Sequence, residues 1–190
     1  NCYEKVLKIK PEHALAHYGI GVILKKKANY KEAIKKFKQA ITFDPNSADS
    51  YYYLSNVQME EGQLEAAIEN CKIALELRPD WAELINLFGT IQLRQGSLDA
   101  ALATFEQAIS IKPNFDIALN NGGIVQTKKG DLQAALESHK QAIKANPKSS
   151  KNHYNAGAVF RHIGDLESAI ESYGEAIKID PKYYEAHWNQ

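Results

Sequence analysis

The six prolines of this chain stand at one fixed interval, and this spacing constrains the fold more than any other feature. Each neighbouring pair is 34 residues apart. Proline lacks a backbone N–H and clashes with the preceding helical turn, so each one indicates the end of a helix. A fixed period of roughly 20 to 50 residues is typical of repeat architectures, in which each unit packs on the next. The prolines are Pro11, Pro45, Pro79, Pro113, Pro147 and Pro181.

Other columns recur with the same period when Ala14 is taken as position 1 of a 34-residue repeat. Positions 20 and 27 are always alanine, and position 8 is always glycine or serine. Position 15 is glycine in every repeat except at Ala28. Glycine favours a left-handed C-cap, so the first helix is predicted to end there. Apolar residues between these columns recur at helical spacing, so each repeat is predicted to hold two helices of roughly fourteen residues joined by a short turn. The residue after position 15 is predicted to cap the second helix, as Asn29, Ser97, Asp131 and Asp165.

This pattern resembles the tetratricopeptide repeat (TPR), a helix-turn-helix unit of about 34 residues. The first repeat follows the family pattern with His17, Ile20, Gly21, Leu24, Ala33, Phe37, Ala40 and Pro45. The resemblance implies an all-α fold, a right-handed α-solenoid or superhelix of stacked antiparallel helix pairs. We predict a single array over residues 1–190, in which 1–13 end a preceding repeat and 184–190 begin a further one, so that the chain is a fragment of a longer solenoid. The complete repeats are predicted at 14–47, 48–81, 82–115, 116–149 and 150–183.

Composition excludes several classes of function. Lys plus Arg and Asp plus Glu are 23 each, and this neutral balance argues against nucleic acid as a partner. No apolar run approaches the roughly 20 residues that span a bilayer, so we expect no membrane partner and a cytoplasmic location. No Cys-x-x-Cys, zinc spacing or catalytic triad stands out from the repeat. We therefore predict no cofactor, no metal and no catalytic residue in this chain.

Several polar residues fall in structural columns of the repeat. His17, His153 and His187 share position 4, where we expect each ring to fill space and find one hydrogen-bond partner rather than bind a metal. Cys71 and His139 replace a large residue at position 24, as Phe37, Phe105 and Tyr173 occupy it elsewhere, and both are predicted to lie in the core. Gly122 stands where a large apolar residue is usual, so we expect a thinly packed core there.

The charge is distributed unevenly between the first two complete repeats. Repeat 14–47 has seven lysines and two acidic residues, hence +5, whereas repeat 48–81 has two basic and seven acidic residues, hence −5. The stretch KKKANYKEAIKKFK is either a docking patch or a solvated helix face. The second interpretation needs no partner, because cations are favoured near a helix C-terminus.

The family resemblance implies that the first helix of each repeat lines a concave groove that binds peptide. Positions 2, 5, 6, 9, 12 and 13 would face this groove, which is aromatic in the first repeats and rich in amides in the last. The asparagines at position 6 are similar to the asparagine ladder of an O-linked glycosyltransferase, which grips substrates by their backbones. The carboxylate clamp of co-chaperones is rejected, because only Asn121 and Lys151 match it. The predicted contact residues are Tyr18, Tyr52, Tyr53, Asn56, Asn86, Asn120, Asn121, Tyr154, Asn155 and Arg161.

These features predict a protein–protein interaction scaffold that binds a protein or peptide segment in the groove without covalent chemistry. Tyrosine and arginine are typical energetic anchors of such contacts. An alternative is a substrate-recruiting arm of a larger enzyme, such as an O-linked glycosyltransferase. A third hypothesis is weak end-to-end self-association through the outermost helices.

Overall fold

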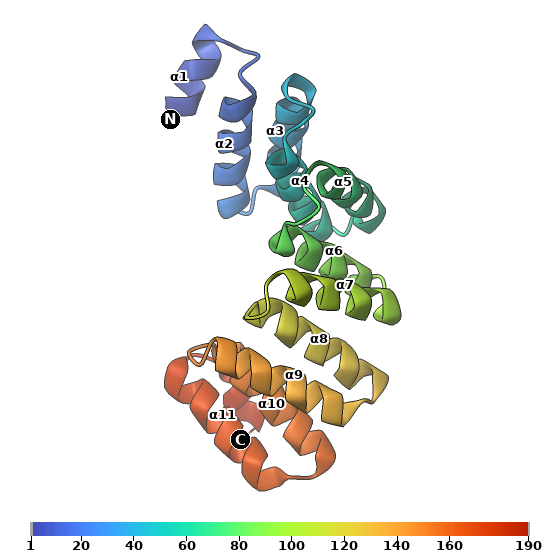
Figure 1. The fold of residues 1–190 in the computed structure, drawn as a ribbon. Helices are drawn as coiled ribbons and strands as arrows, with labels where there is room; N and C mark the ends of the chain where they lie inside the picture. The colour runs from blue at the N-terminus through green and yellow to red at the C-terminus, as the bar shows by residue number, and fades with distance from the viewer. Residues whose placement is uncertain (1, 190) are drawn as a thin grey trace. The chain divides into compact units, whose positions relative to one another are not determined.

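The computed structural model describes residues 2–189, and these residues form twelve α-helices with no strand among them (Figure 1). The helices are α1 (Cys2–Ile9), α2 (Ala14–Lys26), α3 (Tyr30–Phe43), α4 (Ala48–Glu60), α5 (Leu64–Leu77), α6 (Ala82–Arg94), α7 (Leu98–Ile111), α8 (Asp116–Lys129), α9 (Leu132–Ala145), α10 (Ser150–Ile163), α11 (Leu166–Ile179) and α12 (Tyr184–Asn189). Consecutive helices form antiparallel pairs, as in α2 with α3 and α10 with α11. The predicted all-α fold of helix pairs is confirmed.

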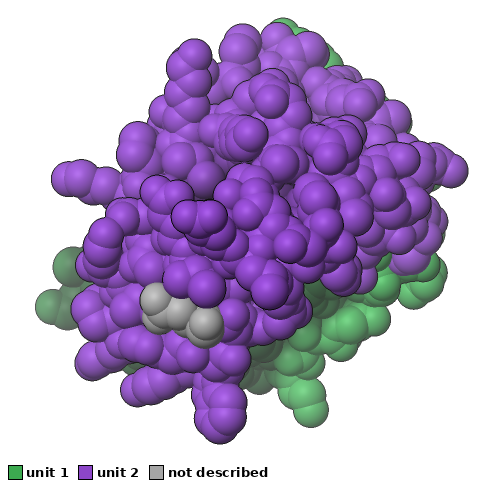
Figure 2. Space-filling view, turned by 90° about the horizontal axis from the view of Figure 1, so that it is seen from below, with its two compact units in different colours: residues 1–95 green, residues 96–190 purple. Residues whose placement is uncertain are grey.

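The chain divides into two compact units, residues 1–95 and 96–190, which Figure 2 colours green and purple. The boundary falls between α6 and α7, inside the predicted repeat 82–115. Within the first unit α2 contacts α4 and α4 contacts α6, and within the second α8 contacts α10. The first helices of successive repeats therefore form a continuous face in each unit. That all the repeats form one array stays a prediction.

Left-handed residues end the first helix of the repeats, as the position-15 column predicts. Gly62, Gly96, Gly130 and Gly164 have φ between 76° and 90°. Ala28 adopts the same region at φ 55°, where its Cβ makes the conformation costly. The column is therefore set by backbone conformation, because only glycine enters this region without steric cost.

Helix capping differs from the sequence-based expectation. Among the four predicted caps of the second helices, only Asp165 accepts a hydrogen bond, from the Ser168 N–H at 3.1 Å. The other three, Asn29, Ser97 and Asp131, make no side-chain cap, so that prediction is wrong for them. Short polar side chains instead cap first helices: Ser47 Oγ accepts from the Ser50 N–H, and Ser149 Oγ from the Asn152 N–H.

Position 8 is small because a ring from the second helix lies directly on it. A Cβ at Gly21 would stand 2.7 Å from the ring of Phe37, and one at Gly157 would stand 2.8 Å from the ring of Tyr173. Phe37 and Tyr173 are themselves almost fully buried. The absence of a side chain at position 8 thus lets the ring at position 24 pack against the backbone of the first helix.

The position-4 histidines each have the single partner that the sequence predicts. The Nε2 atoms of His17, His153 and His187 donate to the carbonyl oxygens of the prolines six residues earlier, at 2.8, 3.0 and 3.1 Å. These bonds fasten the turn between repeats to the next helix. Residues 2–189 contain no group of three or more His, Cys, Asp or Glu that could hold a metal ion.

The two cysteines are predicted to differ sharply in reactivity. Cys71 is buried in the core and Cys2 is exposed, and burial raises the pKa of the Cys71 thiol to about 11. Because the thiolate is the nucleophile, Cys71 should react with Ellman's reagent at least roughly tenfold more slowly than Cys2 in the folded chain. The variant Cys2→Ser, followed with and without urea, isolates Cys71. Rapid labelling of Cys71 without urea would contradict this packing.

Candidate functional site

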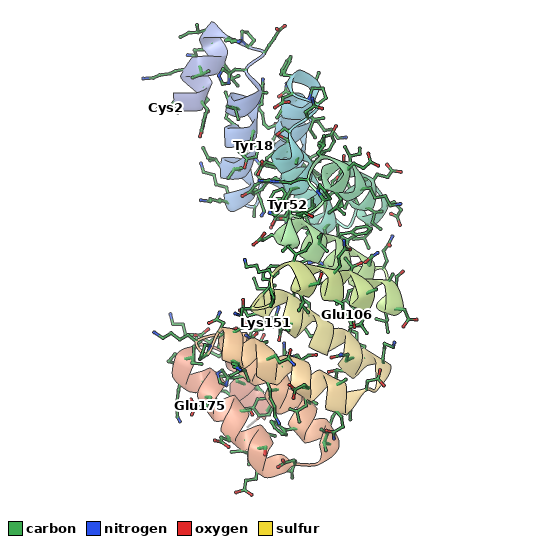
Figure 3. The ribbon with its side chains drawn as sticks, in the orientation of Figure 1. Cys2, Tyr18, Tyr52, Glu106, Lys151 and Glu175 are labelled. Carbon is green, nitrogen blue, oxygen red and sulfur yellow. The ribbon has the colours of Figure 1, made fainter. Side chains whose placement is uncertain are left out.

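Three tyrosines of the first unit lie together on the face formed by α2 and α4 (Figure 3 labels Tyr18 and Tyr52). The ring centroids of Tyr18 and Tyr53 are 5.5 Å apart, and those of Tyr52 and Tyr53 are 5.2 Å apart, both edge to face. Tyr53 also stacks on the buried ring of Phe37 at 5.8 Å. All three tyrosines remain half-buried, whereas Phe37 has no exposed surface. Phe37, from α3, thus packs against Tyr18 and Tyr53, and part of each tyrosine ring remains accessible.

Burial and neighbouring polar groups change the chemistry of this cluster. Burial, with the nearby Tyr53, raises the pKa of Tyr18 to about 12. Burial also raises the pKa of Tyr52 and lowers that of Lys25, whose Nζ lies 5.2 Å from the centroid of the Tyr53 ring. At neutral pH the cluster therefore offers uncharged phenol rings beside a cation.

The aromatic surface continues beyond the predicted residues. Tyr52 contacts Trp81 at a centroid distance of 4.7 Å, and the Arg78 guanidinium lies 4.2 Å from the Trp81 ring. Arg78 also pairs with Asp49 at 3.5 Å, where both side chains are about half exposed. The aromatic surface of Tyr18, Tyr52, Tyr53 and Trp81 is thus bordered by the ion pair of Arg78 and Asp49.

A hydrogen-bonded trio occupies the corresponding place in the second unit. Asn120 Oδ1 accepts from Asn155 Nδ2 at 2.8 Å and is 3.1 Å from His139 Nδ1. Asn120 is only 2% exposed. Its carbonyl oxygen is engaged inside the protein, so Asn120 orients Asn155 and does not face a partner as the sequence suggests. Asn155 itself is half-buried, and these bonds use its N–H and not its Oδ1.

The ring of His139 is neutral in this setting. Burial lowers its pKa to about 4. Because a carbonyl oxygen only accepts, Nδ1 of His139 carries the proton that it donates to Asn120. The ring belongs to the core, as the sequence predicts, with 1% of its surface exposed.

Tyr154 and Arg161 converge on Asn189 at the end of the second unit. The ring of Tyr154 contacts those of Tyr173 and Tyr183 at 5.5 and 5.1 Å. Asn189 Nδ2 donates to the Tyr154 hydroxyl at 3.4 Å, and Arg161 Nη1 donates to Asn189 Oδ1. Tyr154 is half-buried and Arg161 is exposed. These side chains come from α10, α11 and α12 and the turn before α12.

The remaining predicted contact residues lie on the same first helices. Asn56 is half-buried on α4, Asn86 is half-buried on α6, and Asn121 is half-buried on α8. The structure therefore places each of them where a partner can reach part of the side chain, but does not gather them into one cluster.

One three-residue arrangement recurs across the repeats. Position 5 contacts position 24 of its own repeat and position 6 of the next. This gives Tyr18 with Phe37 and Tyr53, Asn120 with His139 and Asn155, and Tyr154 with Tyr173 and Asn189. The trio is aromatic in the first unit, fully polar around His139, and mixed at the end of the chain.

Two family models match the sequence, one for the TPR repeat over residues 26–60 and 157–189, and one for the tetratricopeptide repeat over 58–121. Together they cover more than half of the chain. The chain belongs to the tetratricopeptide repeat family. TPR proteins generally mediate protein–protein interactions, and no catalytic domain is evident in the matched or described residues. Among curated proteins no sequence matches this TPR chain.

Several solved TPR structures share the fold at low sequence identity. YrrB, described as a TPR protein with an unusual peptide-binding site, is 22% identical over 99% of this chain and 97% of its own, with a TM-score of 0.70. TTC0263, a thermophilic TPR protein of Thermus thermophilus, is 21% identical over 93% of this chain and 96% of its own, with a TM-score of 0.79. PilF of Pseudomonas aeruginosa is 18% identical over 93% and 80%, with a TM-score of 0.83. At such identities the likeness establishes the fold alone.

One further aromatic column lies beside the predicted contact residues. Position 34 is aromatic at Trp81, Phe115 and Tyr183, and a basic residue three positions earlier covers two of these rings. Trp81 and Tyr183 contact the position-5 tyrosines of their own repeats. The sequence contains the signal for these pairs, because repeats 48–81 and 150–183 each have an aromatic residue at both position 5 and position 34.

Within residues 2–189 no helix is long and apolar enough to cross a membrane.

Proposed function

We propose that this TPR chain is an interaction module that captures an extended protein or peptide segment on the face that the first helices of the repeats form in each unit. The observation that carries the proposal is the contrast in burial along this face. The position-24 rings Phe37 and Tyr173 are almost completely buried, whereas the tyrosines that they support remain half-exposed. Half-exposed rings that are held rigidly by a buried layer provide contact area at low entropic cost.

Aromatic rings, more than amides, are proposed to supply the contact energy. The amide N–H groups of Asn155 and Asn189 already donate to Asn120 and Tyr154. Asn189 Nδ2 also donates to the Glu185 carbonyl oxygen at 2.7 Å, so both of its N–H bonds are used, whereas Asn155 keeps one N–H beside its bond to Asn120. The amides thus do not form a uniform row of free donors, and the alternative of a substrate-recruiting arm gains no separate support. The peptide-binding site reported for YrrB makes a peptide ligand a reasonable first choice for the test.

A peptide-display selection against the 190-residue chain tests the proposal. Peptides that bind the first unit should lose at least roughly tenfold in affinity with Asn56→Arg, and peptides that bind the second unit should do so with Asn121→Arg, because each asparagine is half-buried on the face of its own unit and a long cation would obstruct that face. The matched control is Glu69→Arg on the exposed side of α5, which should bind as the unchanged chain does. Selected peptides that ignore both face variants, or that are lost with Glu69→Arg, would contradict the proposed face.

A further inference from the structure

A cavity of ≈ 240 Å³ opens beside His139 on the proposed binding face of the second unit. Its lining comes from α8, α9 and α10, and only His139 and Val159 among the lining residues are buried. The wall combines three aliphatic side chains with an imidazole, an amide, a hydroxyl and one exposed lysine. The lining residues are Ile124, Thr127, Lys128, His139, Asn155, Ala158 and Val159.

A larger hollow of ≈ 500 Å³ lies elsewhere, beside the turn that precedes α8 and the outer side of α9. Only Leu119 among its lining residues is buried, and Glu137 lies on it together with Lys140 and Lys144. It offers neither a buried polar group nor a uniform charge. The cavity beside His139 is smaller, but two core side chains, His139 and Val159, belong to its lining.

In the first unit an aromatic side chain occupies the position that corresponds to this cavity. By the 34-residue register, Phe37 corresponds to His139 and Tyr53 corresponds to Asn155. In the first unit the Tyr53 ring stacks on Phe37 with a centroid distance of 5.8 Å and an interplanar angle of 23°. It packs in one cluster with Val22 and Val57, the counterparts of Ile124 and Val159.

In the second unit this ring is missing. Asn155 is shorter than tyrosine and donates its N–H to Asn120 instead of covering His139. The imidazole of His139 is also a smaller ring than the phenyl of Phe37. These two large-to-small replacements leave a space that keeps two of the aliphatic neighbours of Tyr53, since Ile124 and Val159 correspond to Val22 and Val57.

We propose that this cavity accepts one aromatic side chain of the captured peptide, which takes the place that the Tyr53 ring has in the first unit. This inference rests on the proposed function, because it names the feature of the ligand that the second unit recognises. A cavity of about 150 Å³ already accommodates benzene, so the space suffices for one ring. An aromatic ring is expected here because the Tyr53 ring fills the corresponding place beside Val22 and Val57 in the first unit, and the cavity keeps Ile124 and Val159 as their counterparts.

The test uses 4-methylphenol as a stand-in for a tyrosine side chain and 3-methylbutan-1-ol as a stand-in for an aliphatic one. Binding is followed by NMR at the methyl groups of Ile124 and Val159 in the 190-residue chain. The phenol should shift these signals saturably, with a dissociation constant on the order of millimolar. The alcohol should bind at least roughly tenfold more weakly, and the methyl signals of Leu54 should not move with either probe.

Two variants close the cavity without removing a core residue. Asn155→Tyr recreates the residue that Tyr53 provides in the first unit, and Ala158→Ile introduces the residue that Ile124 provides at the same repeat position. Both should keep the helical circular dichroism spectrum and lose the phenol-induced shifts. Unsaturable shifts in the unchanged chain, equal binding of both probes, or phenol binding that persists in both variants would overturn the proposal.

Peptide selection separates this inference from the proposed function. If selected peptides require an aromatic residue and Asn155→Tyr removes them, both hold. If peptides bind the face but Asn155→Tyr and aromatic substitution leave their affinity unchanged, the ring cavity is wrong while the interaction function stands. If no peptide binds although the phenol occupies the cavity in the unchanged chain alone, the proposed function fails and the cavity remains a ring-binding site.

Discussion

Acidification from pH 7 to pH 4 should destabilise this TPR chain by about 3 kcal/mol through His139 alone. Burial lowers the pKa of His139 from 6.5 to about 4 in the folded chain. In the unfolded chain His139 therefore binds a proton below about pH 6.5, whereas in the folded chain it binds one only near pH 4. Stability from this group is fully present above pH 6.5 and is lost progressively as the pH falls through this window.

The surroundings of His139 leave few other contributors to this effect. Its Nδ1 faces the neutral Asn120, and Asn155 and Val159 line the cavity beside it. Lys128 is the charged residue in that lining, and it is exposed. A protonated imidazole would thus be buried without a carboxylate among these neighbours to compensate it.

Urea-induced unfolding, followed by circular dichroism between pH 4 and pH 8, measures the effect. The matched control is the double variant Asn120→Tyr with His139→Phe, which reproduces the Tyr18–Phe37 pair of the first unit. The difference in stability between the chain and this variant should change by about 3 kcal/mol over the window, because the other titrating groups are common to both. A difference that stays constant with pH would contradict the buried, neutral histidine.

The adjacent glycines of α8 should respond in opposite directions to the same substitution. Gly123→Ala places a Cβ 2.7 Å from the buried ring of His139, and this overpacking should cost about 1 to 3 kcal/mol. Gly122→Ala finds its nearest neighbour, Leu102 Cδ1, at 3.9 Å, which is an ordinary contact. It should stabilise the chain by about 1 kcal/mol, because alanine has the higher helix propensity.

Each glycine variant is the control for the other, since both insert one methyl group at a buried position of the same helix. Thermal or urea unfolding at pH 7 gives the two changes in free energy of unfolding. Equal changes would show that propensity, and not the packing of His139 on Gly123, decides the effect. A third variant, Gly157→Ala, should resemble Gly123→Ala, because its Cβ would meet the ring of Tyr173 at 2.8 Å.

The sequence by itself determined the helical architecture of this protein. The proline and glycine columns act through local backbone conformation, so the ends of the helices could be placed without knowing any tertiary contact. The left-handed φ at Gly62, Gly96, Gly130 and Gly164 follows from this local rule. The same register identified position 24 as a core column, and with it the burial of Cys71 and His139.

Only the tertiary structure decided which polar side chains are used inside the protein. Asn120 and Asn155 both belong to the predicted contact residues, yet one is buried and the other half-exposed. The difference arises because Asn120 meets His139 from α9 and Asn155 from α10, contacts between residues 19 and 35 positions apart. The cavity beside His139 also depends on tertiary contacts, because side chains from α8, α9 and α10 together determine its volume. A one-dimensional period specifies which residues meet, but the size and direction of each side chain determine what room is left.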